Sequence, residues 1–283
     1  MTNFLADTLE NQTVTGPSAT FTYRRTGPQG GVPLVLLMRF RGTIDWWDPE
    51  FIDRLSEHRD VILFDNVGTG YTGGEPRDSA QGFADGAIEF IDALGLEQVD
   101  LLGWSLGGIV VQIVALTRAD LVRKVIVAGS SAPGVAPGIP EMSERVLTIM
   151  AKPDADAEDI LFLFYPETDE ARKSGLEHLA KVSRRVDAGG PVVTEEAANG
   201  QLVAVATLLG ADWDEVSAHL RSIRQPVLYA NGLHDVMIPA LGSYKAVEQV
   251  PDSTLVIYSD AGHGFLFQHI DGFVAQVSLF LDN

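Results

Sequence analysis

The chain has 283 residues, 46% of them hydrophobic, and a formal net charge of -19. This length fits one elaborated α/β domain or two small domains, and we favour a single domain with an insertion. The acidic balance and the lack of a clustered basic run argue against nucleic acid and anionic membrane surfaces as partners. Because the chain holds no cysteine, disulfides, thiolate metal sites and a cysteine nucleophile are excluded.

The N-terminal part of the chain gives an expectation for the compartment. Residues 1–20 do not show the basic stretch followed by an apolar stretch that is typical of a secretion signal. No later segment offers the roughly 18 uninterrupted apolar residues that a membrane-spanning helix needs. The sequence therefore predicts a cytoplasmic protein.

Short strands and helices alternate from the start of the chain. Thr13–Arg25 alternates around a Gly-Pro turn and predicts an antiparallel pair of strands. The continuous apolar runs Pro33–Met38 and Asp60–Phe64 are typical of parallel strands that are covered on both faces. Apolar residues at helical spacing predict helices over Pro49–His58 and Ala80–Leu94.

The alternation continues in the second half of the chain. Residues 99–111, VDLLGWSLGGIVV, predict a buried strand, a tight turn and an apolar helix. Further strands are expected at Lys124–Ala128, Pro226–Ala230 and Thr254–Tyr258, and a closing helix at Phe273–Leu281.

The long interval between Ala128 and Pro226 has no clear strand. It begins with Ser130–Pro140, which is rich in Pro, Gly and Ser and is typical of a linker. Helices are expected in the rest of it, at Glu141–Met150, Ala157–Phe164, Thr168–Val186 and Thr194–Leu209. The whole pattern predicts a doubly wound, mainly parallel sheet of eight strands, with a core of residues 1–129 and 219–283 and an inserted helical cap of residues 130–218.

The pentapeptide Gly103-Trp104-Ser105-Leu106-Gly107 joins a strand to a helix. A serine in such a turn takes up a strained backbone conformation that lifts its Oγ above the sheet, and glycines two residues away relieve the crowding. The helix that follows directs its first amides toward an oxyanion formed beside Ser105. The pattern predicts a nucleophilic serine, and the alternative is a Gly-rich turn without chemistry.

A serine nucleophile needs a base, and the base needs an orienting partner. Among the six histidines, His263 follows the last expected strand in a glycine-containing loop, so we assign it as the general base. Asp235 follows the strand at Pro226–Ala230 and is assigned as the orienting acid. Asp260 is the rival, but its separation of three residues from His263 restricts the geometry.

The other histidines have simpler interpretations. His58, His178 and His219 lie in polar or charged surroundings and are expected to be solvated. His269 is expected at the surface or at a helix start, and His234 either lines the pocket or serves packing.

Acyl transfer also requires backbone donors for the tetrahedral oxyanion. One is expected to be the amide of Leu106, directly after the nucleophile. The second is expected from the loop after the Pro33–Met38 strand, where we choose the amide of Phe40.

Together these motifs resemble those of the α/β-hydrolases, in the branch that contains 3-oxoadipate enol-lactonases, cofactor-free haloperoxidases and small carboxylesterases. The resemblance covers nearly the whole chain, although the cap matches only in its placement. It rests on the serine pentapeptide, Asp65–Thr72, Gly232–Pro239 and Gly262-His263.

The chain departs from that family pattern in two segments. Met38-Arg39 stand where the family has His-Gly, and Val67 and Thr72 replace the Arg and Ser of its Asp-x-Arg-Gly-x-Gly-x-Ser segment. The fold is expected to survive both changes. Losing the glycine is expected to bear on how the Phe40 amide is presented. Arg39 and Arg41 either bring positive charge to the site or have an ordinary surface or ion-paired role.

The resemblance and the residue chemistry imply a carboxylesterase or lactonase. His263 would deprotonate Ser105, the alkoxide would attack the carbonyl, and water activated by His263 would release the acid from the acyl-enzyme. No metal or organic cofactor is implied, because no ligand cluster has metal spacing and Gly68-x-Gly70 lacks the third glycine of a dinucleotide fingerprint.

The expected substrate is a small apolar ester or lactone. Candidate walls of its pocket are Trp46, Trp104, Leu161, Phe164 and Phe265. Two alternatives share the same triad: haloperoxidase-like perhydrolysis without a cofactor, and a binding protein for small molecules with slow turnover. The sequence leaves the oligomeric state open, a homo-oligomer included.

Overall fold

An eight-stranded sheet forms the centre of the protein in the computed structural model, which describes residues 3–152 and 154–283. The strand order is β1-β2-β4-β3-β5-β6-β7-β8, with β1 and β2 antiparallel and β3 to β8 mutually parallel. The strands are β1 (Gln12–Thr15), β2 (Thr20–Thr26), β3 (Leu34–Leu37), β4 (Val61–Phe64), β5 (Val99–Trp104), β6 (Val122–Ala128), β7 (Val227–Gly232) and β8 (Ser253–Tyr258). The expected fold class, a mainly parallel sheet of eight strands, is confirmed.

Helices cover both faces of the sheet. One hydrophobic cluster joins it to α1 (Pro49–Ser56) and α11 (Ile270–Asp282). A second cluster joins it to α2 (Ala80–Ala93), α3 (Leu106–Thr117) and α9 (Ala240–Val247). The short elements η1 (Leu5–Thr8), η2 (Ile44–Trp46) and α10 (Phe265–Gln268) complete the core.

The continuous apolar strands are explained by this double covering. Every residue of β3 and β5 is buried. In β3, Leu34 and Leu36 belong to one hydrophobic cluster, whereas Val35 and Leu37 belong to the other. Successive side chains of a strand point to opposite faces, so both faces must be apolar when both are covered by helices.

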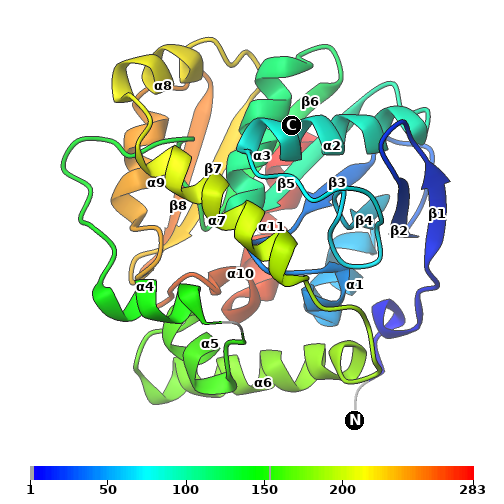
Figure 1. Ribbon diagram of the computed structural model, residues 1–283, viewed down its shortest axis with the longest axis horizontal. Helices are drawn as coiled ribbons and strands as arrows, with labels where there is room; N and C mark the ends of the chain where they lie inside the picture. Colours follow the sequence, from blue (N-terminus) through cyan, green and yellow to red (C-terminus); the bar gives the residue numbers. More distant parts are fainter. Residues whose placement is uncertain (1–2, 153) are drawn as a thin grey trace.

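The segment between β6 and β7 holds five helices and no strand among its described residues. They are α4 (Glu144–Ala151), α5 (Ala157–Phe164), α6 (Asp169–Val186), α7 (Glu195–Leu209) and α8 (Trp213–Leu220), and we call them the cap. Figure 1 shows α4, α5 and α6, in green, grouped at one edge of the molecule. The sequence did not predict α8, and the expected boundary after residue 218 falls inside that helix.

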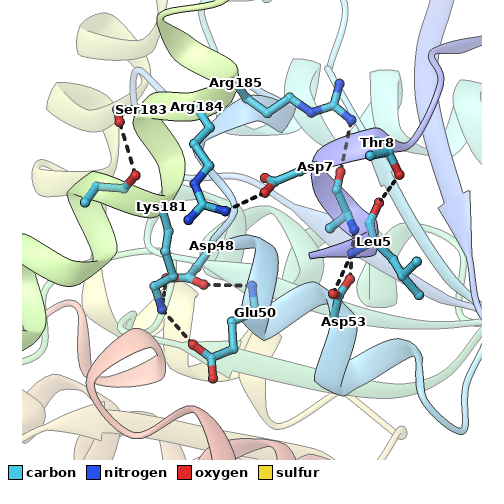
Figure 2. Close-up of polar contacts among 12 residues, drawn as sticks. Leu5, Asp7, Thr8, Asp48, Glu50, Asp53, Lys181, Ser183, Arg184 and Arg185 are labelled. Atoms are coloured by element: carbon cyan, nitrogen blue, oxygen red, sulfur yellow. Dashed lines mark hydrogen bonds and ion pairs between the residues drawn. The ribbon is translucent and has the colours of Figure 1, made fainter. Parts of the chain in front are cut away.

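Charged side chains attach α6 to the core (Figure 2). Lys181 reaches Asp48 at 2.8 Å and Glu50 at 3.0 Å, both at the start of α1. One turn further along, Arg184 pairs with Asp7 of η1 at 2.9 Å. Because Asp48 is also the N-cap of α1, one carboxylate fixes the start of a core helix and the position of a cap helix.

His178 is buried against this attachment, which corrects the expectation that it is solvated. The side chain is 1% exposed, its Nδ1 lies 3.0 Å from Asp48 Oδ2, and its ring stacks on Phe267 at 4.2 Å. Burial lowers the pKa of His178, and this effect outweighs the opposing attraction of Asp48. The neutral imidazole therefore donates its Nδ1–H to the Asp48 carboxylate.

Replacing His178 with Gln is expected to reduce the dependence of the free energy of unfolding on pH in the acidic range. The pKa of His178 in the folded state lies below its ordinary value of 6.5. Below about pH 6.5, His178 therefore binds a proton in the unfolded chain more readily than in the folded protein. Wild-type stability therefore falls as the pH drops through this range. At pH 8 the variant is expected to be about 1–2 kcal/mol less stable, because the stacked ring is lost. Urea unfolding between pH 8 and pH 5 measures whether the difference in free energy of unfolding between wild type and variant becomes smaller as the pH falls.

The exposed His219 of α8 supplies the control for this experiment. The His219→Gln variant should follow the wild-type profile throughout. Parallel profiles for wild type and His178→Gln would contradict the assignment of the acid sensitivity to His178.

Among residues 3–152 and 154–283, none of the helices combines the length and the apolar character needed to cross a bilayer.

Candidate active site

Ser105 occupies a sharp turn between β5 and α3. Its φ of 58° and ψ of -119° lie in a region that side chains rarely adopt. A Cβ at position 103 would overlap the Gly107 carbonyl, and a Cβ at position 107 would overlap the Leu37 carbonyl. The two glycines are therefore required by the close approach of three backbone segments, as the sequence argument expected.

Asp235 and His263 come from the loops after β7 and β8 and meet at the carboxyl edge of the sheet. Asp235 Oδ2 lies 2.7 Å from His263 Nδ1. The other carboxylate oxygen accepts the backbone N–H groups of Met237 and Ile238, each at 2.8 Å. The rival acid, Asp260, instead pairs with His269 at 2.9 Å and is 65% exposed.

The second nitrogen of His263 is the one available for proton transfer. The His263 side chain is fully buried, and its Nε2 has no hydrogen-bond partner in the part of the chain that the structure describes. Ser105 and His263 line the same cavity. In the tautomer that donates Nδ1–H to the Asp235 carboxylate, the lone pair that a general base needs is on Nε2.

The loop that carries His263 is held by Trp104 and by the end of α5. Trp104 Nε1 donates to the His263 carbonyl at 3.1 Å, and the two rings lie 5.7 Å apart. The Gly264 N–H donates to the Phe164 carbonyl at 2.8 Å, and the Phe164 ring lies 5.5 Å from the imidazole. The predicted general base is thus positioned by one core residue and one cap residue.

The expected oxyanion donors both lie next to Ser105. Phe40 and Leu106 line a cavity together with Ser105. Within residues 3–152 and 154–283, neither of their N–H groups donates a hydrogen bond. Two unused donors that border the same cavity as the predicted nucleophile are the arrangement that an oxyanion requires.

The loop after β3 holds its shape without the glycine of the family pattern. Its left-handed residue is Arg41, with a φ of 54°, and the Arg41 N–H donates to Gln201 Oε1 at 2.8 Å. The Phe40 carbonyl accepts from Arg39 Nη1 at 2.7 Å. The bond from Gln201 in α7 to this loop connects the cap to the candidate oxyanion donor.

Two cavities meet at Ser105. The first, of about 510 Å³, is bordered by Trp46, Phe164, His263 and Arg39. The second, of about 550 Å³, has mainly aliphatic walls, among them Ile109, Val135, Ile139, Leu147, Val205 and Leu209. Phe40, Met150 and Met237 border both cavities. The sequence argument missed the two methionines, since a lone Met in a loop or helix gives no signal of a pocket.

Three of the expected pocket residues are core residues instead. Trp104 and Phe265 are completely buried, and Leu161 is 4% exposed. Trp104 contacts several rings, Phe265 stacks on Tyr258, and all three belong to one hydrophobic cluster. Apolar character alone does not distinguish a cavity wall from the core that supports it.

The remaining histidines lie away from the two cavities. His58, His219 and His234 are exposed, so the pocket interpretation of His234 is wrong. His269 begins α11, as expected. In the described part of the chain, no three His, Asp or Glu side chains form a cluster that would hold a metal ion.

Comparison with known proteins gives the same family throughout. The family model of the alpha/beta hydrolase fold matches residues 32–270. A solved structure described as an alpha/beta hydrolase fold protein from Chitinophaga pinensis is 30% identical, covers 99% of this chain and 100% of its own, and has a TM-score of 0.87.

Two curated bacterial relatives are similar over most of their length. The "Putative carbamate hydrolase RutD" of Agrobacterium fabrum is 28% identical, over 88% of this chain and 93% of its own. The pimeloyl-[acyl-carrier protein] methyl ester esterase of Proteus mirabilis is 28% identical, over 89% of this chain and 93% of its own. From the family model, the shared fold and these relatives together, the chain belongs to the alpha/beta hydrolase fold family and is a hydrolase.

Proposed function

We propose that this hydrolase cleaves a carboxylic ester or lactone through an acyl-enzyme on Ser105. The observation that carries the proposal is the buried His263, which lines the same cavity as Ser105. Its Nδ1 is bonded to Asp235 at 2.7 Å, and its Nε2 has no partner among the described residues. A serine becomes nucleophilic near neutral pH when such a base accepts its proton.

In the proposed first half-reaction, His263 Nε2 takes the proton of Ser105 as Oγ attacks the substrate carbonyl. The carbonyl oxygen becomes an oxyanion that the N–H groups of Phe40 and Leu106 stabilise. Asp235 stabilises the imidazolium, which then protonates the departing alcohol. In the second half-reaction His263 activates water, which attacks the acyl-enzyme and releases the carboxylic acid and Ser105.

A carbamate is the second candidate substrate, because six of the similar curated relatives are named as putative carbamate hydrolases. The same groups would act on its carbonyl. Donation from the carbamate nitrogen makes that carbonyl a weaker electrophile, so the matched pair phenyl propionate and phenyl N-methylcarbamate compares the two classes directly. We expect faster steady-state hydrolysis of the ester, and the reverse order would favour the carbamate function.

Covalent labelling tests the proposed nucleophile. A fluorophosphonate ester is expected to add once to the protein, and peptide mass spectrometry should find the added mass on Ser105, with loss of ester hydrolysis in proportion to labelling. An active enzyme that resists the label, or carries it on another residue, would contradict the acyl-enzyme proposal. Tight binding of small molecules without turnover or labelling would favour the alternative of a small-molecule binding protein with slow turnover. Peroxide-dependent oxidation that exceeds hydrolysis would favour perhydrolysis.

A further inference from the structure

Arg39 brings a positive charge to the candidate active site. It follows the last residues of β3 and lines the cavity of about 510 Å³ together with Ser105 and His263. The family pattern has a glycine at this position, so the guanidinium group is a feature of this chain.

Aromatic rings surround the Arg39 guanidinium on several sides. Its Cζ lies 4.8 Å from the ring of Trp46, 5.2 Å from that of Phe164 and 5.5 Å from that of Trp104. These rings favour a cation electrostatically and hold the planar group in place. Burial lowers the pKa of Arg39 to about 10, so the group stays cationic at neutral pH.

No carboxylate among residues 3–152 and 154–283 forms an ion pair with Arg39. Its only hydrogen bond among the described residues runs from Nη1 to the Phe40 carbonyl at 2.7 Å, and its buried Nε has no partner there. Of the carboxylates lining the same cavity, Asp45 is already bound by Arg24 at 2.6 Å and Tyr71 at 2.9 Å, and the other two, Asp154 and Glu195, are exposed. A half-buried cation that pairs with no carboxylate among the described residues has donors available to a ligand.

The neighbouring Arg41 is held differently. Its backbone N–H donates to Gln201, its guanidinium donates to the Lys152 carbonyl, and it lies over the ring of Phe40 at 5.3 Å. Both arginines border the cavity of about 510 Å³, but the Arg41 guanidinium is bound to the distant Lys152 carbonyl, whereas Arg39 donates only to the carbonyl of the adjacent Phe40. Arg39 is therefore the better candidate for binding a ligand.

The second cavity at Ser105 has a different character. Its walls are mainly aliphatic side chains from α3, α4 and α7 and from the start of the cap segment, and no lysine or arginine of the described residues lines it. A substrate whose carbonyl carbon lies at Ser105 can extend in two directions, toward Arg39 or into this aliphatic cavity.

We infer that the substrate is an ester that carries a carboxylate on one side of the scissile bond, bound by Arg39, and an apolar group on the other side, bound in the cavity of about 550 Å³. The inference rests on the proposed ester hydrolysis at Ser105 and narrows its substrate class. It replaces the wholly apolar substrate that the sequence predicted. Arg39 is assigned as the residue that determines specificity for the anion.

Matched ester pairs test the inference in the intact protein. One pair is phenyl hydrogen glutarate and phenyl methyl glutarate, with the charge in the acyl part. The other is 4-acetoxybenzoate and methyl 4-acetoxybenzoate, with the charge in the alcohol part. Wild type is expected to prefer the anion of at least one pair by about 10- to 100-fold in kcat/KM. Arg39→Met should abolish that preference, and Arg39→Lys should retain part of it.

A purely structural role of Arg39 predicts a different result. If the arginine only fills the space between the rings, Arg39→Met lowers kcat/KM equally for both members of each pair, and the inference fails. It also fails if wild type shows no preference for either anion. The control is Arg145→Met, which removes another arginine stacked on an aromatic ring, Phe162, from an exposed part of α4 and should leave the preference unchanged.

Calorimetry on a variant without turnover separates this inference from the proposed function. In Ser105→Ala, phenyl hydrogen glutarate or 4-acetoxybenzoate should bind at least about tenfold more tightly than its methyl ester. That difference should disappear in Ser105→Ala/Arg39→Met. If Ser105→Ala binds the acids more tightly than their methyl esters but the wild type hydrolyses none of the four esters, the anion site is supported and ester hydrolysis is contradicted. Equal binding of acid and methyl ester in both pairs would overturn the anion site whatever the activity.

Discussion

Replacing Ser105 with Ala is expected to lower kcat for ester hydrolysis by about five to six orders of magnitude. In the proposed mechanism the substitution removes the only atom that forms the acyl-enzyme, and the residual rate then comes from the proposed oxyanion donors and substrate binding alone. KM should change little, because the Phe40 and Leu106 amides and both cavities remain. Steady-state hydrolysis of nitrophenyl esters, with unfolding curves for both proteins, measures the effect.

Ser130 supplies a matched control for that substitution. It is fully buried in the loop after β6 and its Oγ has no partner among the described residues. Ser130→Ala deletes the same atom beside Gly108 of α3 and should change kcat by less than about threefold. Similar losses in both variants would mean that Ser105→Ala acts through the fold, and the nucleophile would have to be sought elsewhere.

Replacing Asp235 with Asn is expected to reduce kcat by about four orders of magnitude, comparable with the same change in the serine-protease triad. The geometry explains the size of this effect. One oxygen of Asp235 accepts two backbone N–H groups, from Met237 and Ile238. In the Asp235→Asn variant the amide oxygen must take that place, so the NH₂ group faces His263 Nδ1. The imidazole then carries its proton on Nε2 and is unable to accept one from Ser105.

The rival acid gives the control for this second substitution. Asp260→Asn alters a partly exposed pair with His269 and should change kcat by less than about threefold. The activity ratio of the two variants is measured with one ester at several pH values. A larger loss in Asp260→Asn than in Asp235→Asn would reverse the assignment of the orienting acid.

Local sequence patterns predicted the sheet well because its strands are buried on both faces. The segments at β3, β4, β5 and β7 are mainly apolar runs, and each is buried along its whole length. The serine turn was equally predictable, since Gly103 relieves a clash with Gly107 inside the turn itself; the approach of the Leu37 carbonyl to Gly107 is a further, non-local constraint. By contrast, α8 begins Trp-Asp-Glu after an Asp N-cap. In a helix of eight residues, these acidic residues leave too few apolar positions for the helical spacing to be recognised in the sequence.

The unpredicted features depend on contacts between distant parts of the chain. His178 has polar neighbours on its own helix, but Asp48, 130 residues earlier, gives it a buried partner. The surroundings of Arg39 are built from Trp46, Trp104 and Phe164, which lie in three separate segments. Periodicity describes which face of an element is apolar, but it holds no information about which element packs there.

The bond from Gly264 to Phe164 has a consequence for protein engineering. Exchanging cap segments between relatives is an obvious route to new substrates, because the helices are one continuous insertion. Here the last residue of α5 supplies both a backbone acceptor and an aromatic ring to the loop that carries His263, the proposed general base. A chimera with the cap of a relative therefore also receives that relative's contacts from the end of α5 to the histidine loop. It keeps its catalytic rate only if the transplanted segment ends α5 with an equivalent residue in the same place.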